Sequence, residues 1–177
     1  MLQTEIAGRT IPSPDGYPSK GYVFRDFQLC SSEGLPVLLS DYRRQSSMVL
    51  VFTGESDFVA ALLSELNVHE SELAESETRV LVIIPGTQQR AAALKDSLHL
   101  QFTVLVDVDG RVHRSAGTED HARCALPALF ITDQFGEVFA AYRVGQGENL
   151  PVIAEIQSWL ELISRQCPEC GSPEWPD

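Results

Sequence analysis

The sequence predicts an α/β domain in the form of a three-layer sandwich, with helices on both faces of one mixed sheet. Three apolar, β-rich runs at 47–52, 79–85 and 102–107 are separated by segments with helical spacing. They are followed by a hairpin pattern at 128–144 and a final amphipathic helix. Alternating units require a parallel core with right-handed crossovers, and the hairpin adds antiparallel strands.

The chain begins with a segment, 1–20, that is rich in Pro, Gly, Ser and Thr and reads as an extended arm. Residues 22–29 alternate as a strand, and 35–39 follow a "SSEG" turn as a short second strand. Ser40 then suits the N-cap of a single helical turn.

The first alternating units are the strongest part of the pattern. The run at 47–52 is continuously apolar, as expected of a central strand that is covered on both faces. The helix predicted at 57–73 can be capped by its first residue, an aspartate, and has leucines at helical spacing. A second central strand at 79–85 precedes a helix at 87–100 that begins on a threonine cap.

The third strand ends in a Gly turn at 110, and residues 111–125 read as irregular or weakly helical. The hairpin at 128–144 has its turn at 133–136. The closing helix, 150–166, has one apolar stripe, made of Ile153, Ile156, Trp159, Leu160 and Ile163. The domain thus covers residues 21–166, and a Pro-rich tail with two cysteines covers 167–177.

Composition narrows the choice of partner and compartment. A chain of 177 residues fits a single domain, and its 44% hydrophobic content suits a soluble globular protein. A net charge of -12 argues against nucleic acid and against anionic membranes as partners. The first residues lack a basic start and an apolar segment, so we expect a cytoplasmic protein with reduced or metal-bound cysteines.

Several stretches, in order, resemble one family: "FRDFQLCSSEGLPVLLSDYR", "MVLVFTG", "TVLVDVDGRVHRSAG" and "LPALFITDQFGEVFAAY". They are similar to the redoxin family of alkyl hydroperoxide reductases and thiol-specific antioxidants, which are peroxiredoxin-like proteins. The resemblance covers residues 21–165. It implies a thioredoxin-like fold and a role in antioxidant thiol-redox chemistry as an oxidoreductase.

The resemblance fails at the reactive group. Peroxidases of this family place a cysteine in the first turn of the helix after the central strand, where the helix N-terminus lowers the pKa of the thiol. The equivalent window here, with Ser56, Asp57 and Val59, contains no cysteine. A serine hydroxyl does not ionise near neutral pH, so the standard peroxidase mechanism cannot run at this degenerate site.

Pro127 occupies the position at which the family's peroxidases carry an arginine and thioredoxins keep a cis-proline. We expect a cis bond here, with the backbone of Leu126 against the helix N-terminus. Together with Ser56, Asp57 and Val59, Pro127 therefore marks the positions of the family's active site, which lacks its cysteine in this sequence.

Two of the four cysteines lie inside the domain. Cys124 precedes Pro127 by three residues, and Arg114, His121 and Arg123 could lower the pKa of its thiol. It is either a relocated nucleophile or an inert loop thiol. Cys30 reads as a half-buried packing residue.

The tail pair Cys167 and Cys170 has the spacing of a zinc knuckle. Zinc needs four ligands, and the remainder could come from a second subunit or from within the chain, namely Cys30, Cys124, His113 or His121. A redox dithiol and an idle tail are the other interpretations. Three hypotheses follow: a scaffold retained for binding or assembly, an oxidoreductase using Cys124 or the tail pair with a thiol reductant, and a homodimer linked by structural zinc.

Overall fold

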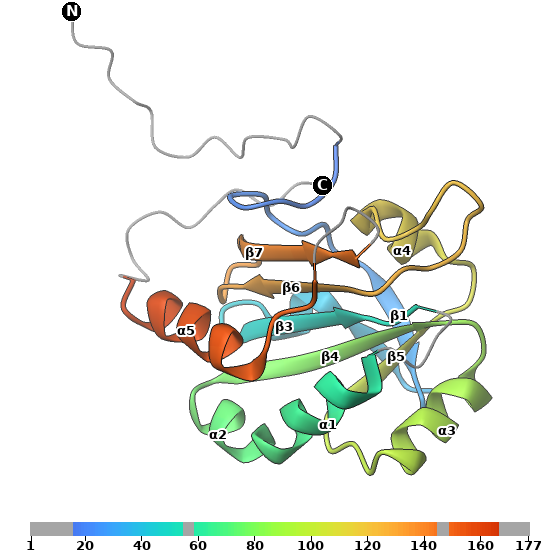
Figure 1. Ribbon diagram of the computed structural model, residues 1–177, viewed down its shortest axis with the longest axis horizontal. Coiled ribbons are helices and arrows are strands. Elements are labelled where there is room, and N and C mark those ends of the chain that lie inside the picture. Colours follow the sequence, from blue (N-terminus) through green and yellow to red (C-terminus); the bar gives the residue numbers. More distant parts are fainter. Residues whose placement is uncertain (1–15, 55–58, 145–148, 167–177) are drawn as a thin grey trace, which may run out of the picture.

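The computed structural model describes residues 16–54, 59–144 and 149–166. Its centre is one seven-stranded mixed sheet with the order β2-β1-β5-β4-β3-β6-β7 (Figure 1). The strands are β1 (Gln28–Ser31), β2 (Pro36–Leu38), β3 (Ser47–Phe52), β4 (Thr78–Pro85), β5 (Thr103–Asp107), β6 (Ala128–Thr132) and β7 (Val138–Arg143).

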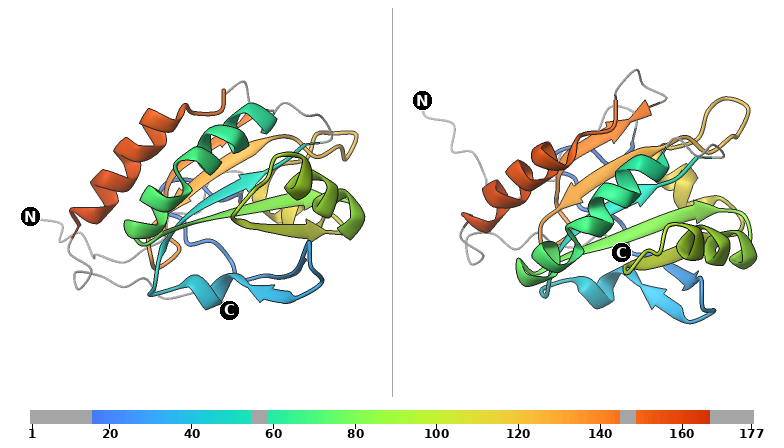
Figure 2. Two further views of the ribbon diagram at one scale, coloured as in Figure 1. Left: turned by 90° about the horizontal axis from the view of Figure 1, so that it is seen from below. Right: turned by 60° about the horizontal axis from the view of Figure 1, so that its bottom comes forward.

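The helices are η1 (Leu39–Tyr42, 3-10), α1 (Ala60–Val68), α2 (Glu70–Glu75), α3 (Gln88–Ser97), α4 (Arg111–Ala116) and α5 (Ile153–Ser164). Helices α1, α2, α3 and α5 pack on one face of the sheet (Figure 2). Helix α4, η1 and the segment around Phe24 pack on the other. The thioredoxin-like three-layer sandwich expected from the sequence is confirmed.

Strand β3 contributes side chains to the cores on both faces of the sheet. It pairs in parallel with β4, and β4 pairs in parallel with β5. It pairs antiparallel with β6, which forms the closing hairpin with β7. Alternate β3 side chains enter opposite cores, with Val49 and Val51 on one face and Leu50 and Phe52 on the other, and all are fully buried. The continuous apolar run therefore reflects burial on both faces.

The N-terminal strand is shorter than predicted. Residues 22–27 contribute only one isolated bridge among the described residues, from Val23 to Glu137. Phe24 instead packs into the core on the face covered by α4 and η1, and its N–H donates to the carbonyl of Gly136. The side chain of Arg143 donates to the carbonyl of Pro18, so the end of the predicted arm also lies against the domain.

Three helix boundaries differ from the expected ones. Ser40 lies inside η1 and does not cap it, because the Asp41 carboxylate accepts from the N–H of Leu38, one turn earlier. The helix predicted at 57–73 is divided at His69 into α1 and α2, and its predicted cap, Asp57, lies outside the described residues. The weakly helical segment contains one short regular helix, α4, between two left-handed glycines. The predicted cap at Thr87 is confirmed, since its hydroxyl accepts from the N–H of Arg90.

Candidate functional site

The candidate site lies where β3 runs into the connection to α1. Thr53 continues the ladder, because its N–H donates to the carbonyl of Ile83, and Gly54 is buried beside it. Val59, at the start of α1, is 1% exposed and belongs to the core between the sheet and helices α1, α2, α3 and α5. It is therefore a packing residue. Ser56 and Asp57 lie outside the described residues.

Pro127 lies directly against this connection. A Cβ on Gly54 would lie 2.8 Å from Pro127 Cδ and 2.9 Å from the carbonyl oxygen of Ala125. Only a residue without a side chain permits this approach of two backbones.

The expected cis bond before Pro127 is wrong. The described residues contain no cis peptide bond. The segment is held extended from both sides, because the N–H of Leu126 donates to the carbonyl of Thr118 and the carbonyl of Pro127 accepts from Val144. The ordinary trans form satisfies these bonds, and trans is the lower-energy isomer.

Cys124 lies at the rim of the same region. Its N–H donates to the Asp120 carboxylate at 2.8 Å and its carbonyl accepts from the N–H of Asp120, so a tight loop fixes its backbone. The thiol is half-buried, one residue before the carbonyl that faces Gly54. Of the three basic residues expected to act on it, Arg114 forms an ion pair with Glu119 at 3.5 Å. His121 and Arg123 are exposed.

Cys30 is exposed on β1, not half-buried as predicted. It sits between Pro36 and Val106 in the sheet, at a position of β1 whose side chain points away from the core. It therefore provides a thiol outside the candidate site.

A buried ionisable pair lies beneath the connection, and sequence reasoning missed its role. Asp107 ends β5 and His113 lies in α4, and both side chains are completely buried. The backbone N–H of His113 donates to Asp107 Oδ2 at 2.9 Å, and its Nδ1 lies 2.7 Å from the same oxygen. On its other side, His113 Nε2 lies 3.2 Å from the carbonyl oxygen of Thr53. The imidazole therefore joins the ends of β3 and β5.

Both ring nitrogens of His113 face oxygen atoms. A carbonyl oxygen only accepts, so the contact with Thr53 is a hydrogen bond when Nε2 carries a hydrogen, and the contact with Asp107 is one when a proton lies between Nδ1 and Oδ2. Burial raises the pKa of Asp107, but the hydrogen bonds from His113 outweigh it and hold that pKa below its ordinary value. These contacts therefore favour the ionised form of the Asp107 carboxyl. Asp107 Oδ1 and Thr53 Oγ1 are buried without a hydrogen-bond partner within the described part of the chain.

Helix α3 adds a positively charged side chain, Arg90, at this end of the sheet. Arg90 Nη2 lies 3.5 Å from the carbonyl oxygen of Gly54, and its Nη1 lies 3.5 Å from that of Pro85. Side chains from α3 and from α4, Arg90 and His113, therefore both contact the backbone at the end of β3.

The described residues offer no group of three or more His, Cys, Asp or Glu side chains that could hold a metal ion. His113 cannot supply a ligand to zinc at the tail, because both of its ring nitrogens already have partners inside the core. Cys167 and Cys170 lie outside the described residues. No helix within the described ranges is long and apolar enough to cross a membrane.

Comparison with known proteins agrees with this geometry. The model of the AhpC/TSA family matches residues 21–141. The chain belongs to this family. No curated protein sequence matches the chain significantly.

Solved structures show the same fold at low sequence identity. Peroxidoxin BcpB from Mycobacterium tuberculosis is 16% identical with a TM-score of 0.73, over 85% of this chain and 100% of that one. AhpC from Enterococcus faecalis is 18% identical with a TM-score of 0.68, over 82% and 96%. A putative thiol:disulfide interchange protein DsbE from Chlorobium tepidum is 19% identical with a TM-score of 0.65, over 83% and 96%.

Proposed function

We propose that this AhpC/TSA family member keeps the thioredoxin-like scaffold for binding or assembly and does not act as a peroxidase through a resident thiol. The observation that carries the proposal is the absence of any cysteine between Cys30 and Cys124 in the sequence. The connection from β3 to α1 falls within that interval. Peroxide reduction in this fold needs a thiolate there, and no other side chain of the window supplies one.

The surroundings of the connection support a structural role. Val59 is committed to the core, and Gly54 is packed against Pro127. The side chain of His113 lies against Asp107 and the carbonyl of Thr53 and is completely buried. Because both of its ring nitrogens are occupied, His113 holds the connection in place and has no free nitrogen to exchange a proton with a substrate.

A second candidate is thiol chemistry at Cys124. It is favoured by one observation: the segment that carries Cys124 reaches Gly54 through the carbonyl of Ala125. A half-buried thiol at this rim could meet a substrate that enters from the vacant side. The tail pair Cys167/Cys170 remains a further source of thiols or of zinc ligands, shared between two chains in a homodimer.

Peroxide consumption with an excess of a dithiol reductant tests these alternatives. The assay compares the wild type with Cys124→Ser, with Cys167→Ser/Cys170→Ser, and with Cys30→Ser as the control for an exposed thiol outside the site. We expect all four proteins to consume peroxide at the background rate. Turnover that disappears in Cys124→Ser alone would establish the second candidate.

Zinc per chain, measured on the same four proteins, tests the assembly role of the tail. Zinc held between two chains would appear as half an equivalent or one equivalent per chain, together with a dimer mass. Both would be lost in Cys167→Ser/Cys170→Ser and retained in Cys30→Ser. Zinc that persists without the tail cysteines would contradict this role.

A further inference from the structure

The end of the N-terminal arm lies across the C-terminal ends of α4 and β7. This strap, residues 16–19, contacts both of them. The ring of Tyr17 lies on Gly117, which follows α4, and a Cβ at Gly117 would be 2.5 Å from Tyr17 Cγ. The carbonyl of Pro18 accepts a hydrogen bond from Nη2 of Arg143, the last residue of β7. The strap therefore joins two elements that are distant in the sequence.

Arg143 is the residue that connects the strap to α4. It is only 7% exposed, and its Cζ lies 4.8 Å from the ring centre of Phe130. Its Nε donates to the carbonyl of Ala116, the last residue of α4, at 3.0 Å. A planar guanidinium donates in two directions at once, so one buried side chain holds α4 and the strap together.

A tight turn follows the strap. The N–H of Tyr22 donates to the carbonyl of Ser19 at 2.9 Å, with Gly21 in the third position of the turn. The φ of Gly21 is +82°, a value that glycine adopts without strain. Beyond the turn, Gly21 and Tyr22 exchange backbone hydrogen bonds with Val138, so the chain lies beside β7 (Figure 1). The turn is therefore a suitable hinge between the strap and a firmly paired segment.

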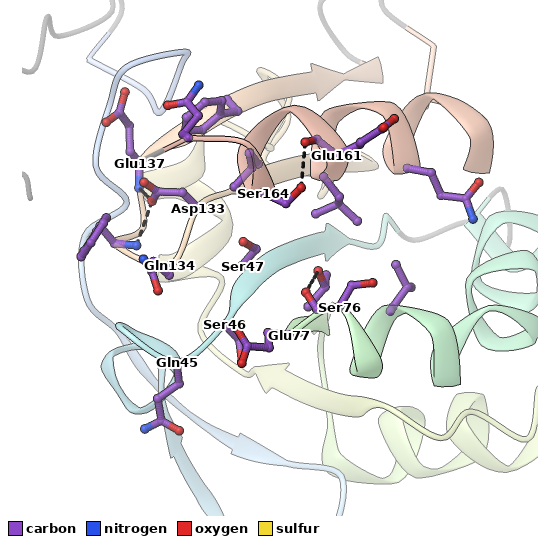
Figure 3. A pocket seen from close by; sticks show the side chains of 18 of the residues that line it. Gln45, Ser46, Ser47, Ser76, Glu77, Asp133, Gln134, Glu137, Glu161 and Ser164 are labelled. Atoms are coloured by element: carbon purple, nitrogen blue, oxygen red, sulfur yellow. Dashed lines mark hydrogen bonds between the residues drawn. The ribbon is translucent and has the colours of Figure 1, made fainter. Parts of the chain in front are cut away.

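The β6–β7 turn holds this paired segment further along. Val23 forms a bridge with Glu137, and the N–H of Phe24 donates to the carbonyl of Gly136 at 2.9 Å. The same turn forms one wall of a cavity of about 780 Å³ at the start of β3 (Figure 3). None of the described residues that line this cavity belongs to the strap, so the two features are separate.

The end of α4 that the strap contacts also supports the candidate site. The N–H and the hydroxyl of Thr118 both donate to the carbonyl of His113, at 3.0 and 3.1 Å. The carbonyl of Thr118 accepts from the N–H of Leu126, next to Pro127. His113 Nε2 lies 3.2 Å from the carbonyl oxygen of Thr53. A continuous series of contacts therefore leads from the strap through α4 to the connection between β3 and α1.

We propose that the strap is a latch, and that its release loosens α4 and, through α4, the connection between β3 and α1. In the closed form, Tyr17 covers Gly117 and Pro18 binds Arg143; in the open form, both contacts are lost by rotation at the hinge. Helix α4 suits this control, because a helix of six residues depends on its packing and not on its own hydrogen bonds. The biological role of the latch rests on the binding function proposed above, whereas the movement itself does not.

Amide hydrogen exchange of the full-length protein, followed by NMR, tests the latch. Tyr17→Ala removes the ring from Gly117 and should raise the exchange rates of Gly117 and Thr118 about tenfold. The rate at Thr53 should rise by at least about twofold, while the amides of α3 should stay unchanged. Tyr17→Phe keeps the ring and should behave as the wild type. Lys20→Ala is the matched control, because Lys20 lies in the adjoining turn but contacts Trp159 of α5, at 5.6 Å.

Arg143→Lys tests the second contact of the latch, since an ammonium group keeps the charge but lacks the fork that reaches both carbonyls. It should raise the same rates in α4, and where this variant does not fold, the Tyr17 variants decide alone. The proposal is overturned if Tyr17→Ala leaves Gly117 or Thr53 unchanged, or raises exchange equally in α3 and α4, or if Lys20→Ala has the same effect. Peroxide consumption is not measured here, so failure of the latch and failure of the proposed function remain distinguishable.

Discussion

Asp107→Asn is the sharpest test of the buried pair beneath the candidate site. The substitution keeps the shape of the side chain and removes its charge. Asp107 Oδ2 accepts two hydrogen bonds from His113, at 2.7 and 2.9 Å, and neither residue is exposed. Removing the charged acceptor of two buried hydrogen bonds costs roughly 3–5 kcal/mol. For a domain of this size, that corresponds to a fall in Tm of roughly 6–20 °C.

Glu72→Gln provides the matched control, because it breaks a histidine–carboxylate pair of similar length on the surface. His69 and Glu72 lie 3.0 Å apart but are 32% and 70% exposed. We expect Glu72→Gln to cost less than about 1 kcal/mol. Urea unfolding followed by circular dichroism gives both free energies. Equal shifts in the two variants would refute the assignment of a strong pair.

The same pair makes a signed prediction for pH. The pKa of Asp107 is lower in the folded protein than in the unfolded chain. Its stabilisation is therefore fully present above the ordinary carboxyl pKa and is lost as pH falls through the lower, folded value. The difference in unfolding free energy between wild type and Asp107→Asn should shrink on acidification in that range. A difference that stays constant down to acid unfolding would contradict an ionised Asp107.

Three further substitutions test other parts of the structure. Gly54→Ala should destabilise by about 1–3 kcal/mol in urea unfolding, because its Cβ would meet Pro127 Cδ at 2.8 Å; a neutral effect would show that the contact is loose. Thr87→Ala should cost about 1 kcal/mol by loss of the N-cap of α3, and Thr87→Ser should restore most of it; no difference between the two would refute the cap. Glu137→Gln should raise stability at neutral pH by about 0.5 kcal/mol and lose this advantage in acid, since the pKa of Glu137 is raised; destabilisation at neutral pH would contradict that direction.

The architecture could be predicted from the sequence because its signals are local and strong. The apolar run at 47–52 appears unchanged as β3, and the hairpin turn and the α5 stripe lie where expected. The strand predicted at 22–29 was less accurate. Val23 and Phe24 are adjacent and both buried, Val23 forms a single bridge, and the regular strand begins only at Gln28.

The site was only partly predictable. The missing cysteine and the closeness of Pro127 follow from the order of the motifs. The isomer of Pro127 does not, because distant hydrogen bonds to Thr118 and Val144 hold the chain. The pairing of His113 with Asp107 depends on a left-handed turn at Gly110 that brings α4 back under β5. Its sequence signal was a histidine placed among the buried positions of α4.

The rate of peroxide consumption per chain, with and without cysteines, tests the central claim most directly. The comparison uses the wild type and a variant in which Cys30, Cys124, Cys167 and Cys170 are all serine. A scaffold without a working thiol predicts the same rate for both, at the level of the reductant alone. A wild-type rate well above that of the variant would contradict the claim and place the reactive thiol elsewhere in the chain.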